Sequence, residues 1–192
     1  MSDTIVIGLH AHLDPETEAA IVAACEAAEE RGIGTRGWNK TLRPHMTMGS
    51  WYVPSIDQDA FDRMTRRLCG LGSFPLRLSF MASVRERLHI NLCPVVQHEL
   101  LRYHERVHEA LGSDTPPNHQ RDIDLPGQWV PHVSVMDCAD SDLPAVMPLI
   151  RSLGLPRAAH IRGFGFASYR GGEAPRYVSA GECEQARESG NL

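Results

Sequence analysis

The sequence predicts a single α+β domain built of two lobes that resemble each other in pattern. Strand-like alternation and helix-like periodicity follow each other twice along the chain, in a β-α-β order with further strands between. Hydrophobic residues make up 42% and charged residues 22% of the 192 residues, as in ordinary globular proteins. A chain of this length can bury one core shared by two small lobes. We therefore expect one domain over residues 1–182 and a polar tail over 183–192.

The first strand is expected over residues 4–13, because apolar residues at odd positions alternate there with small or polar ones. His10 and His12 share the second face of this strand, where a polar structural role or a substrate contact is possible. Asp14-Pro15-Glu16 then supplies an N-cap, a proline at the first helical position and an acid in the first turn. These signals predict a helix that runs to Glu30.

The remaining elements follow from the same two periodicities. In chain order we expect a strand from Pro44, a helix over 57–71, strands over 74–81 and 88–95, a helix over 97–111, a strand from Pro131, a helix over 143–153 and two closing strands. Two long irregular stretches, 31–43 and 112–130, lead into the strands that start at Pro44 and Pro131. Loops of this length are usually functional or mobile, so both could border one cleft. Their tryptophans, Trp38 and Trp129, would either stack on a nucleobase or anchor the loops to the core.

Composition narrows the function classes. The net charge of -5 and the pI near 6.0 argue against general binding of long nucleic acids, which usually needs a basic balance. Five scattered cysteines without a C-x-x-C pair argue against a disulfide framework and a thiolate zinc site. No apolar run is long enough to span a bilayer, and the N-terminus lacks a basic segment typical of secretory signals. We expect a cytoplasmic protein, without membrane partners, and a monomer as the favoured assembly.

One pattern occurs twice and carries most of the functional information. Pro44-His45-Met46-Thr47-Met48 is repeated in kind as Pro131-His132-Val133-Ser134-Val135. Side chains two residues apart in a strand share a face, so each copy presents an imidazole and a hydroxyl together while its apolar residues turn to the core. Two such strands facing each other would place two imidazoles and two hydroxyls around one small pocket.

This set of groups suits displacement at phosphorus. One imidazole can accept a proton from the attacking oxygen and the other can protonate the leaving oxygen, because the unperturbed pKa of histidine lies near 6.5. The hydroxyls of Thr47 and Ser134 can donate to the non-bridging oxygens of the phosphate. A single copy of the pattern would be weak evidence, since a structural histidine beside a hydroxyl is common. The agreement of both copies favours a catalytic pair.

At these residues the chain resembles the 2H phosphoesterase superfamily, which is named for two H-x-[ST]-x motifs and includes 2'-5' RNA ligase-like proteins and cyclic phosphodiesterases. Phe166-Ala167-Ser168-Tyr169, the Gly171-Gly172 turn and Arg176-Tyr177-Val178 look like the family's closing hairpin. Gly49-Ser50-Trp51-Tyr52 departs from the RNA ligase-like branch. The resemblance implies two pseudo-symmetric β-sheet lobes with outer helices around a central cleft.

The resemblance also implies an activity. It predicts a hydrolase that acts without metal or cofactor on 2',3'-cyclic phosphates or 2'-5' phosphodiesters of small nucleotides or RNA ends, as in RNA processing. The catalytic residues would be His45, Thr47, His132 and Ser134, with His132 as base and His45 as acid in hydrolysis. The physiological substrate, the product phosphate and the choice between hydrolysis and ligation stay open.

Three further residues are expected to bind substrate. Trp51 would share a face with His45 if the first motif strand were regular, and a bulge at Gly49 would remove it from the pocket. Tyr169 lies in the closing hairpin, and Arg43 directly precedes the first motif. Cys138, soon after the second motif, is either a thiol nucleophile or a small buried residue.

Two alternative functions are weighed against this one. His104-Glu105-Arg106-Val107-His108 matches H-E-x-x-H, in which two histidines bind zinc and the glutamate acts as base. The same helix has an apolar stripe that includes His104, which is typical of a helix packing on a sheet, and the third ligand of the extended motif is missing. The second alternative is a protein of the same fold that binds a nucleotide or RNA end without turning it over.

Overall fold

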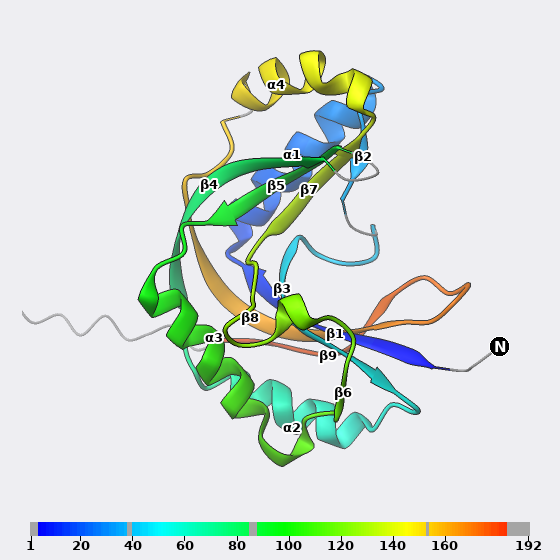
Figure 1. Ribbon diagram of the computed structural model, residues 1–192, viewed down its shortest axis with the longest axis vertical. Helices are drawn as coiled ribbons and strands as arrows, with labels where there is room; N and C mark the ends of the chain where they lie inside the picture. Colours follow the sequence, from blue (N-terminus) through cyan, green and yellow to red (C-terminus); the bar gives the residue numbers. More distant parts are fainter. Residues whose placement is uncertain (1–3, 38–39, 85–87, 153, 184–192) are drawn as a thin grey trace, which may run out of the picture.

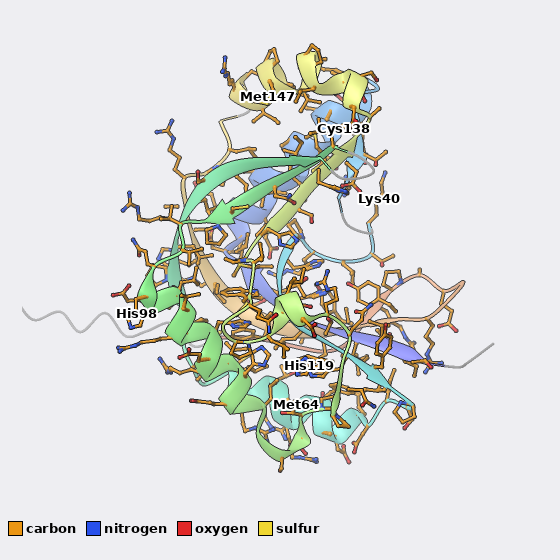
Figure 2. The ribbon with its side chains drawn as sticks, in the orientation of Figure 1. Lys40, Met64, His98, His119, Cys138 and Met147 are labelled. Carbon is orange, nitrogen blue, oxygen red and sulfur yellow. The ribbon has the colours of Figure 1, made fainter. Side chains whose placement is uncertain are left out.

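The computed structural model describes residues 4–37, 40–84, 88–152 and 154–183, and Figure 1 shows how their helices and strands are arranged. The four α-helices of these residues are α1 (Pro15–Glu30), α2 (Gln58–Cys69), α3 (His98–Leu111) and α4 (Leu143–Ser152). The strands are β1 (Ile5–Leu13), β2 (Thr35–Arg36), β3 (His45–Val53), β4 (Phe74–Val84), β5 (Leu88–Pro94), β6 (Asn118–His119), β7 (Val133–Cys138), β8 (Ala158–Tyr169) and β9 (Arg176–Glu182).

The nine strands of the described residues form one sheet, and their pairings are antiparallel. Its order is β2-β7-β5-β4-β8-β1-β3-β6, and β9 pairs with β8. The strands β7 and β3 stand well apart in this order, yet they also meet each other directly through the pair Met46 and Val133. The path from β7 to β3 is therefore closed on itself, which brings two strands that are distant in sequence into contact.

Helices cover the two ends of this closed path. In Figure 1, α1 and α4 lie beside β2, β5 and β7, whereas α2 and α3 lie beside β1, β3, β8 and β9. Helix α1 begins where Asp14 accepts a hydrogen bond from the backbone of Thr17 and Pro15 takes a first-turn position that needs no donor. Helix α2 begins after Asp57, which caps it by accepting a hydrogen bond from the backbone of Ala60. The two groups of helices, each with the strands beside it, are the two lobes that the sequence predicts (Figure 1).

The core is continuous across both lobes. It takes the odd-numbered apolar residues of β1 together with the apolar stripes of the helices, among them Ile21, Met64, Val107 and Leu149. Met46 and Val133, the central residues of the two motifs, are fully buried. No helix among the described residues is both long and apolar enough to cross a bilayer.

The predicted α+β class and the order of the long elements are confirmed. Among the described residues the sequence missed short pieces. These are the strands β2 and β6, which lie inside the two stretches expected to be irregular, and three 3-10 turns at Gly112–Asp114, Asp122–Asp124 and Asp140–Asp142. Cys183, which was placed in the polar tail, is buried against the core, so the folded part extends at least to this residue. Residues 184–192 lie outside the described residues, as does Trp38.

Candidate active site

The two motifs meet at the contact between β3 and β7. The bridging residues are Met46 and Val133, each the apolar residue between the histidine and the hydroxyl of its motif. Because the pairing is antiparallel, the same register continued by one residue sets His45 opposite Ser134 and Thr47 opposite His132. The structure thus brings together the four residues that the sequence predicted to be catalytic.

The two imidazoles are held in the same way. His45 Nδ1 donates to the carbonyl oxygen of Arg43 at 2.8 Å, and His132 Nδ1 donates to that of Val130 at 2.9 Å. In each motif the acceptor is the residue two positions before the histidine. This bond fixes the tautomer, because a neutral imidazole whose Nδ1 carries the proton has a free lone pair on Nε2. Among the described residues no group bonds to either Nε2 atom, so both remain for a substrate.

The electrostatic environment favours a neutral His45. Burial lowers the pKa of His45 to about 4, the hydrogen bond to Arg43 opposes the shift, and the charge of His132 lowers it further. The influence of His132 shows that the two imidazoles are close enough for the proton on one to affect the other. At neutral pH the imidazole of His45 is therefore neutral and can accept a proton.

The first motif hydroxyl opens onto a pocket. This pocket has a volume of about 320 Å³. Its lining consists of Val6, Gly8, His10, Thr47, Ser50, Gln120, Arg121 and Tyr169. Larger depressions lie elsewhere among the described residues, including one of about 1040 Å³ along the β8–β9 hairpin, and none of the four motif side chains lines them. We therefore take the smaller pocket beside Thr47 as the site.

Arg121 is the cation of this pocket, and it is held rigidly. Its Nε and Nη2 atoms donate to the two carboxylate oxygens of Asp124 at 3.0 and 3.1 Å. Asp124 is buried and also accepts a hydrogen bond of 2.6 Å from Ser50. A bidentate pair of this kind fixes the plane of the guanidinium. The stretch 112–130, which the sequence predicted to border the cleft, thus supplies a fixed polar wall.

The second motif hydroxyl lies on the other lobe. Ser134 is half-buried and pairs with Asn91 of β5. Gly37 lies against it, since a Cβ atom added at Gly37 would come within 2.8 Å of the Cβ of Ser134. The Gly37 amide donates to the Val135 carbonyl at 3.1 Å, which holds the 31–43 stretch beside the motif. Both irregular stretches therefore reach the site.

Two histidines of β1 complete the floor of the site. His12 pairs with His45, and His10 pairs with Thr47, on the face that carries the motif side chains. The ring of His10 stacks on that of His45 with centroids 3.5 Å apart and planes at 7°. The alternation of β1 placed both histidines on this face in the sequence. It gave no sign that one of them would lie against a motif histidine.

Of the three predicted substrate-binding residues, only Tyr169 lines the pocket. Its hydroxyl is hydrogen-bonded to His10 Nε2 at 3.0 Å. Arg43 instead forms ion pairs with Glu18 and Glu182, at 2.9 and 2.8 Å, and its contact with substrate stays a prediction. These ion pairs hold the residue whose carbonyl oxygen orients His45.

The expected position of Trp51 beside the pocket is wrong. In the β1–β3 register Leu9 pairs with Gly49 and His10 with Thr47, so Met48 has no partner and forms a bulge. A bulge reverses the alternation beyond it, which turns Trp51 into the core, where it is 0% exposed. Ser50 takes the place on the pocket side instead.

The H-E-x-x-H histidines serve this same bulge. His104 Nε2 and His108 Nε2 both donate to the carbonyl oxygen of Met48, each at 2.9 Å. The nitrogens that would bind zinc in the alternative function are therefore directed at one backbone oxygen, and Glu105 is exposed. His104 is a buried packing residue, as the apolar stripe of the helix indicated.

Trp129 anchors its loop instead of facing the pocket. Its ring stacks on His104 with centroids 4.0 Å apart, and its Nε1 donates to the carbonyl oxygen of Thr47 at 3.0 Å. The indole thus supports the backbone of the first motif. Cys138 is buried, and burial raises the pKa of its thiol to about 11, so it has the character of a packing residue.

Comparisons with known proteins agree with this geometry. The family model of the 2'-5' RNA ligase superfamily matches residues 13–173. E. coli LigT complexed with 3'-AMP is similar in fold, with a TM-score of 0.54 and 12% identity over 96% of this chain and 100% of that chain. Apo E. coli LigT gives a TM-score of 0.53 and 13% identity over the same shares.

Kluyveromyces marxianus Usb1 is a more distant neighbour, with a TM-score of 0.46 and 9% identity over 92% of this chain and 98% of that chain. A comparison with curated proteins found no match. The family model covers both histidine motifs, β1's last residue and the start of the closing hairpin. The chain belongs to the 2'-5' RNA ligase superfamily of 2H phosphoesterases.

Proposed function

We propose that this protein is a metal-independent phosphodiesterase that acts on 2',3'-cyclic phosphates or 2'-5' linkages of small nucleotides or RNA ends by two-histidine acid–base catalysis. The observation that carries this proposal is the matched pair of imidazoles, each oriented by a carbonyl two residues earlier and each with Nε2 left for a substrate. Two proton-transfer groups on either side of one phosphorus suit an in-line displacement.

The reaction needs one proton acceptor and one proton donor. His45 Nε2 takes a proton from water as the water oxygen bonds to phosphorus. The bond from phosphorus to the leaving ribose oxygen breaks, and protonated His132 gives its Nε2 proton to that oxygen. The hydroxyls of Thr47 and Ser134 donate hydrogen bonds to the non-bridging oxygens, where negative charge increases. Proton exchange with water then returns both imidazoles to their starting states.

The buried environment of His45 is the reason for assigning it as base. Its pKa is lowered to about 4, so its imidazole is neutral at neutral pH and can accept a proton, which leaves His132 as the donor. This assignment reverses the roles that the resemblance implied. A bound phosphate anion favours the charged form of an imidazole beside it, which supports a protonated donor once substrate is bound.

The substrate class rests on the family and on the chemistry of the pocket. E. coli LigT, which is similar in fold, has been solved with 3'-AMP, a nucleotide whose phosphate is esterified to a ribose oxygen. In the present chain the pocket beside Thr47 has neutral polar groups and one paired arginine, which suits a nucleoside attached to the reacting phosphate. The pocket volume is near the lower end of small-ligand sites, which favours a small nucleotide or a strand end over a duplex.

The test is a substrate panel with matched variants. Purified protein is offered 2',3'-cyclic nucleotides, 2'-5'-linked and 3'-5'-linked dinucleotides, and a 3',5'-cyclic nucleotide, each with and without a chelator. We expect turnover of a substrate with phosphorus bonded to the ribose 2'-oxygen, unchanged by the chelator and lost in His45→Ala. His98→Ala, at the exposed start of α3, serves as the control and should behave as wild type.

Two outcomes would contradict the proposal. Tight binding of these nucleotides without turnover by freshly prepared protein would favour the non-catalytic alternative. Activity that disappears with the chelator and returns with zinc would show that a metal takes part.

A further inference from the structure

His10 is a buried histidine that belongs to neither motif and that the reaction above does not use. Its side chain is 1% exposed, its Nε2 is hydrogen-bonded to the Tyr169 hydroxyl, and its Nδ1 has no partner among the described residues. It lies flat on His45, with centroids 3.5 Å apart and an angle of 7° between the planes. A polar ring buried in this position needs a reason beyond packing.

The strands around His10 leave room for it. A Cβ atom added at Gly8 would come within 2.9 Å of His10 Nε2 and within 3.3 Å of the Tyr169 ring. One added at Gly165, the partner of His10 on β8, would come within 2.8 Å of His12 Cε1. Two glycines in the middle of strands therefore provide the space that the stacked imidazole and its neighbour occupy.

We propose that His10 is a positioning residue for His45, which covers one face of the catalytic imidazole and fixes its plane. This inference rests on the proposed function. The Arg43 carbonyl sets the rotation of the His45 ring through Nδ1, and the stack with His10 restrains its tilt. Together the two contacts hold Nε2 in one direction, which is what an oriented proton acceptor requires.

The stack also covers one face of His45. Burial is the largest cause of the lowered pKa of His45, and the His10 ring is the group that covers one of its faces. Burial also lowers the pKa of His10, with the charge of His45 as the next cause, so the two rings stay neutral together. Two stacked cations at this distance would repel each other strongly.

The other charged and titratable groups around His45 come from four elements. His12 faces it from β1, His132 from the position just before β7 and Arg43 from the residues before β3. Tyr177 from β9 packs its ring edge-on against the two β1 histidines. Burial, followed by the charges of Arg43 and His45, lowers the pKa of His12 to about 3, so His12 is not a source of positive charge near neutral pH.

The test compares two substitutions of one residue. His10→Ala removes the cover, whereas His10→Phe keeps a flat ring over His45 and removes only the imidazole nitrogens. The pH profile of kcat/KM should show an acid limb that moves up by about one pH unit in His10→Ala, because water reaches the exposed face of His45. Turnover at pH 7 should fall about tenfold. His10→Phe should keep the limb and stay within about threefold of wild type.

Direct titration of His45 by NMR separates this inference from the proposed function. Signals of labelled histidine are assigned with His45→Gln, and His45 is titrated in wild-type protein, in both His10 variants and in the control His98→Ala. A rise of the His45 pKa in His10→Ala and none in His10→Phe supports positioning, even if no phosphodiester is turned over. If His10→Ala does not fold, the comparison of His10→Phe with wild type still decides between ring cover and imidazole chemistry.

Two results would overturn the inference. An unchanged pH profile and unchanged His45 titration in His10→Ala, with only a lower melting temperature, would make His10 a packing residue. A loss of turnover in His10→Phe as large as that in His45→Ala would mean that the His10 imidazole itself takes part in proton transfer.

Discussion

Histidines lie on both faces of β3. The open group, His45 and His132, lies on the pocket side, and the closed group, His104 and His108, comes from helix α3. Both groups contain an imidazole whose pKa is lowered by burial, but they differ in whether Nε2 has a hydrogen-bond partner among the described residues. On the pocket face, burial lowers the pKa of His45 to about 4. On the helix-covered face, burial lowers that of His104 to about 4 as well. His104 Nε2 and His108 Nε2 both donate to the Met48 carbonyl, whereas His45 Nε2 has no hydrogen bond from the described residues.

This difference shows what separates a functional histidine from a structural one here. Neither burial nor a lowered pKa does so, since both groups have them. A matched sequence motif does not do so either, because H-E-x-x-H is complete and serves to satisfy a bulged carbonyl. The deciding feature is an imidazole that is held through Nδ1 and whose Nε2 has no bond from the described residues.

The largest effect is expected from the open group. His45→Ala and His132→Ala should each lower kcat by about 10²- to 10⁴-fold, because either loss leaves one reacting oxygen without its proton partner. The double variant should be little worse than the singles, since the two histidines act as a unit. Steady-state kinetics on the best substrate of the panel measures this, with His98→Ala as control. Near wild-type turnover in either single variant would exclude the two-histidine mechanism.

The motif hydroxyls should come next. Thr47→Val and Ser134→Ala should each lower kcat by about 10- to 1000-fold, as expected when an oriented donor to developing charge is lost. Thr47→Ser keeps the hydroxyl and should retain most of the activity, which separates the donor from the shape of the side chain. Unchanged kcat in the variant that lacks both hydroxyls would remove the phosphate-binding role.

Much of this site could be predicted from local sequence signals. The caps at Asp14 and Asp57 depend on residues three positions apart, and the pairing of imidazole and hydroxyl within each motif follows from strand alternation. Such features need no knowledge of the rest of the chain. The family resemblance added that the two motif strands meet.

The features that the sequence did not predict arise from contacts between distant strands. The bulge at Met48 is a property of the β1–β3 register, so the alternation argument for Trp51 failed at the point where that register shifts. The stack of His10 on His45 depends on the same pairing. Likewise, the Arg121–Asp124 pair faces the pocket only because its loop lies beside β3.

Both groups of histidines should make the protein sensitive to acid. Burial holds the pKa of His12 at about 3, and those of His45 and His104 at about 4, whereas the unfolded chain binds protons near pH 6.5. Below that value the unfolded state therefore takes up more protons than the native state, and stability is lost as the pH falls from about 7 towards 4. Each buried histidine can contribute up to about 1.4 kcal/mol per pH unit over this range.

Urea denaturation at pH 7.5, 6.5 and 5.5 measures this effect before most carboxylates titrate. We expect the free energy of unfolding to fall by about 1 to 4 kcal/mol between the two ends, with a smaller fall in His104→Phe, which removes one neutral buried imidazole. A free energy of unfolding that rises or stays level on acidification would mean that these histidines are charged in the native state.

The smallest effect is expected from the closed group, His104 and His108, and concerns the free energy of unfolding instead of activity. His104 and His108 share one acceptor, so either single change to Phe leaves the Met48 carbonyl with the other donor. Each single variant should therefore lose about 0.5 to 1.5 kcal/mol of stability, the net value of one hydrogen bond.

In the double variant both donors are lost, and the Met48 carbonyl is left in the core without a hydrogen bond from either side chain. This variant should lose about 1 to 3 kcal/mol more than the sum of the singles, because an unsatisfied buried acceptor bears its full desolvation cost. Denaturant unfolding of the four proteins gives this coupling, while kcat on the preferred substrate should change little as long as the protein is folded. Additive losses would mean that the two imidazoles do not share the bond. A fall in kcat comparable to that of His132→Ala would place them in the chemistry after all.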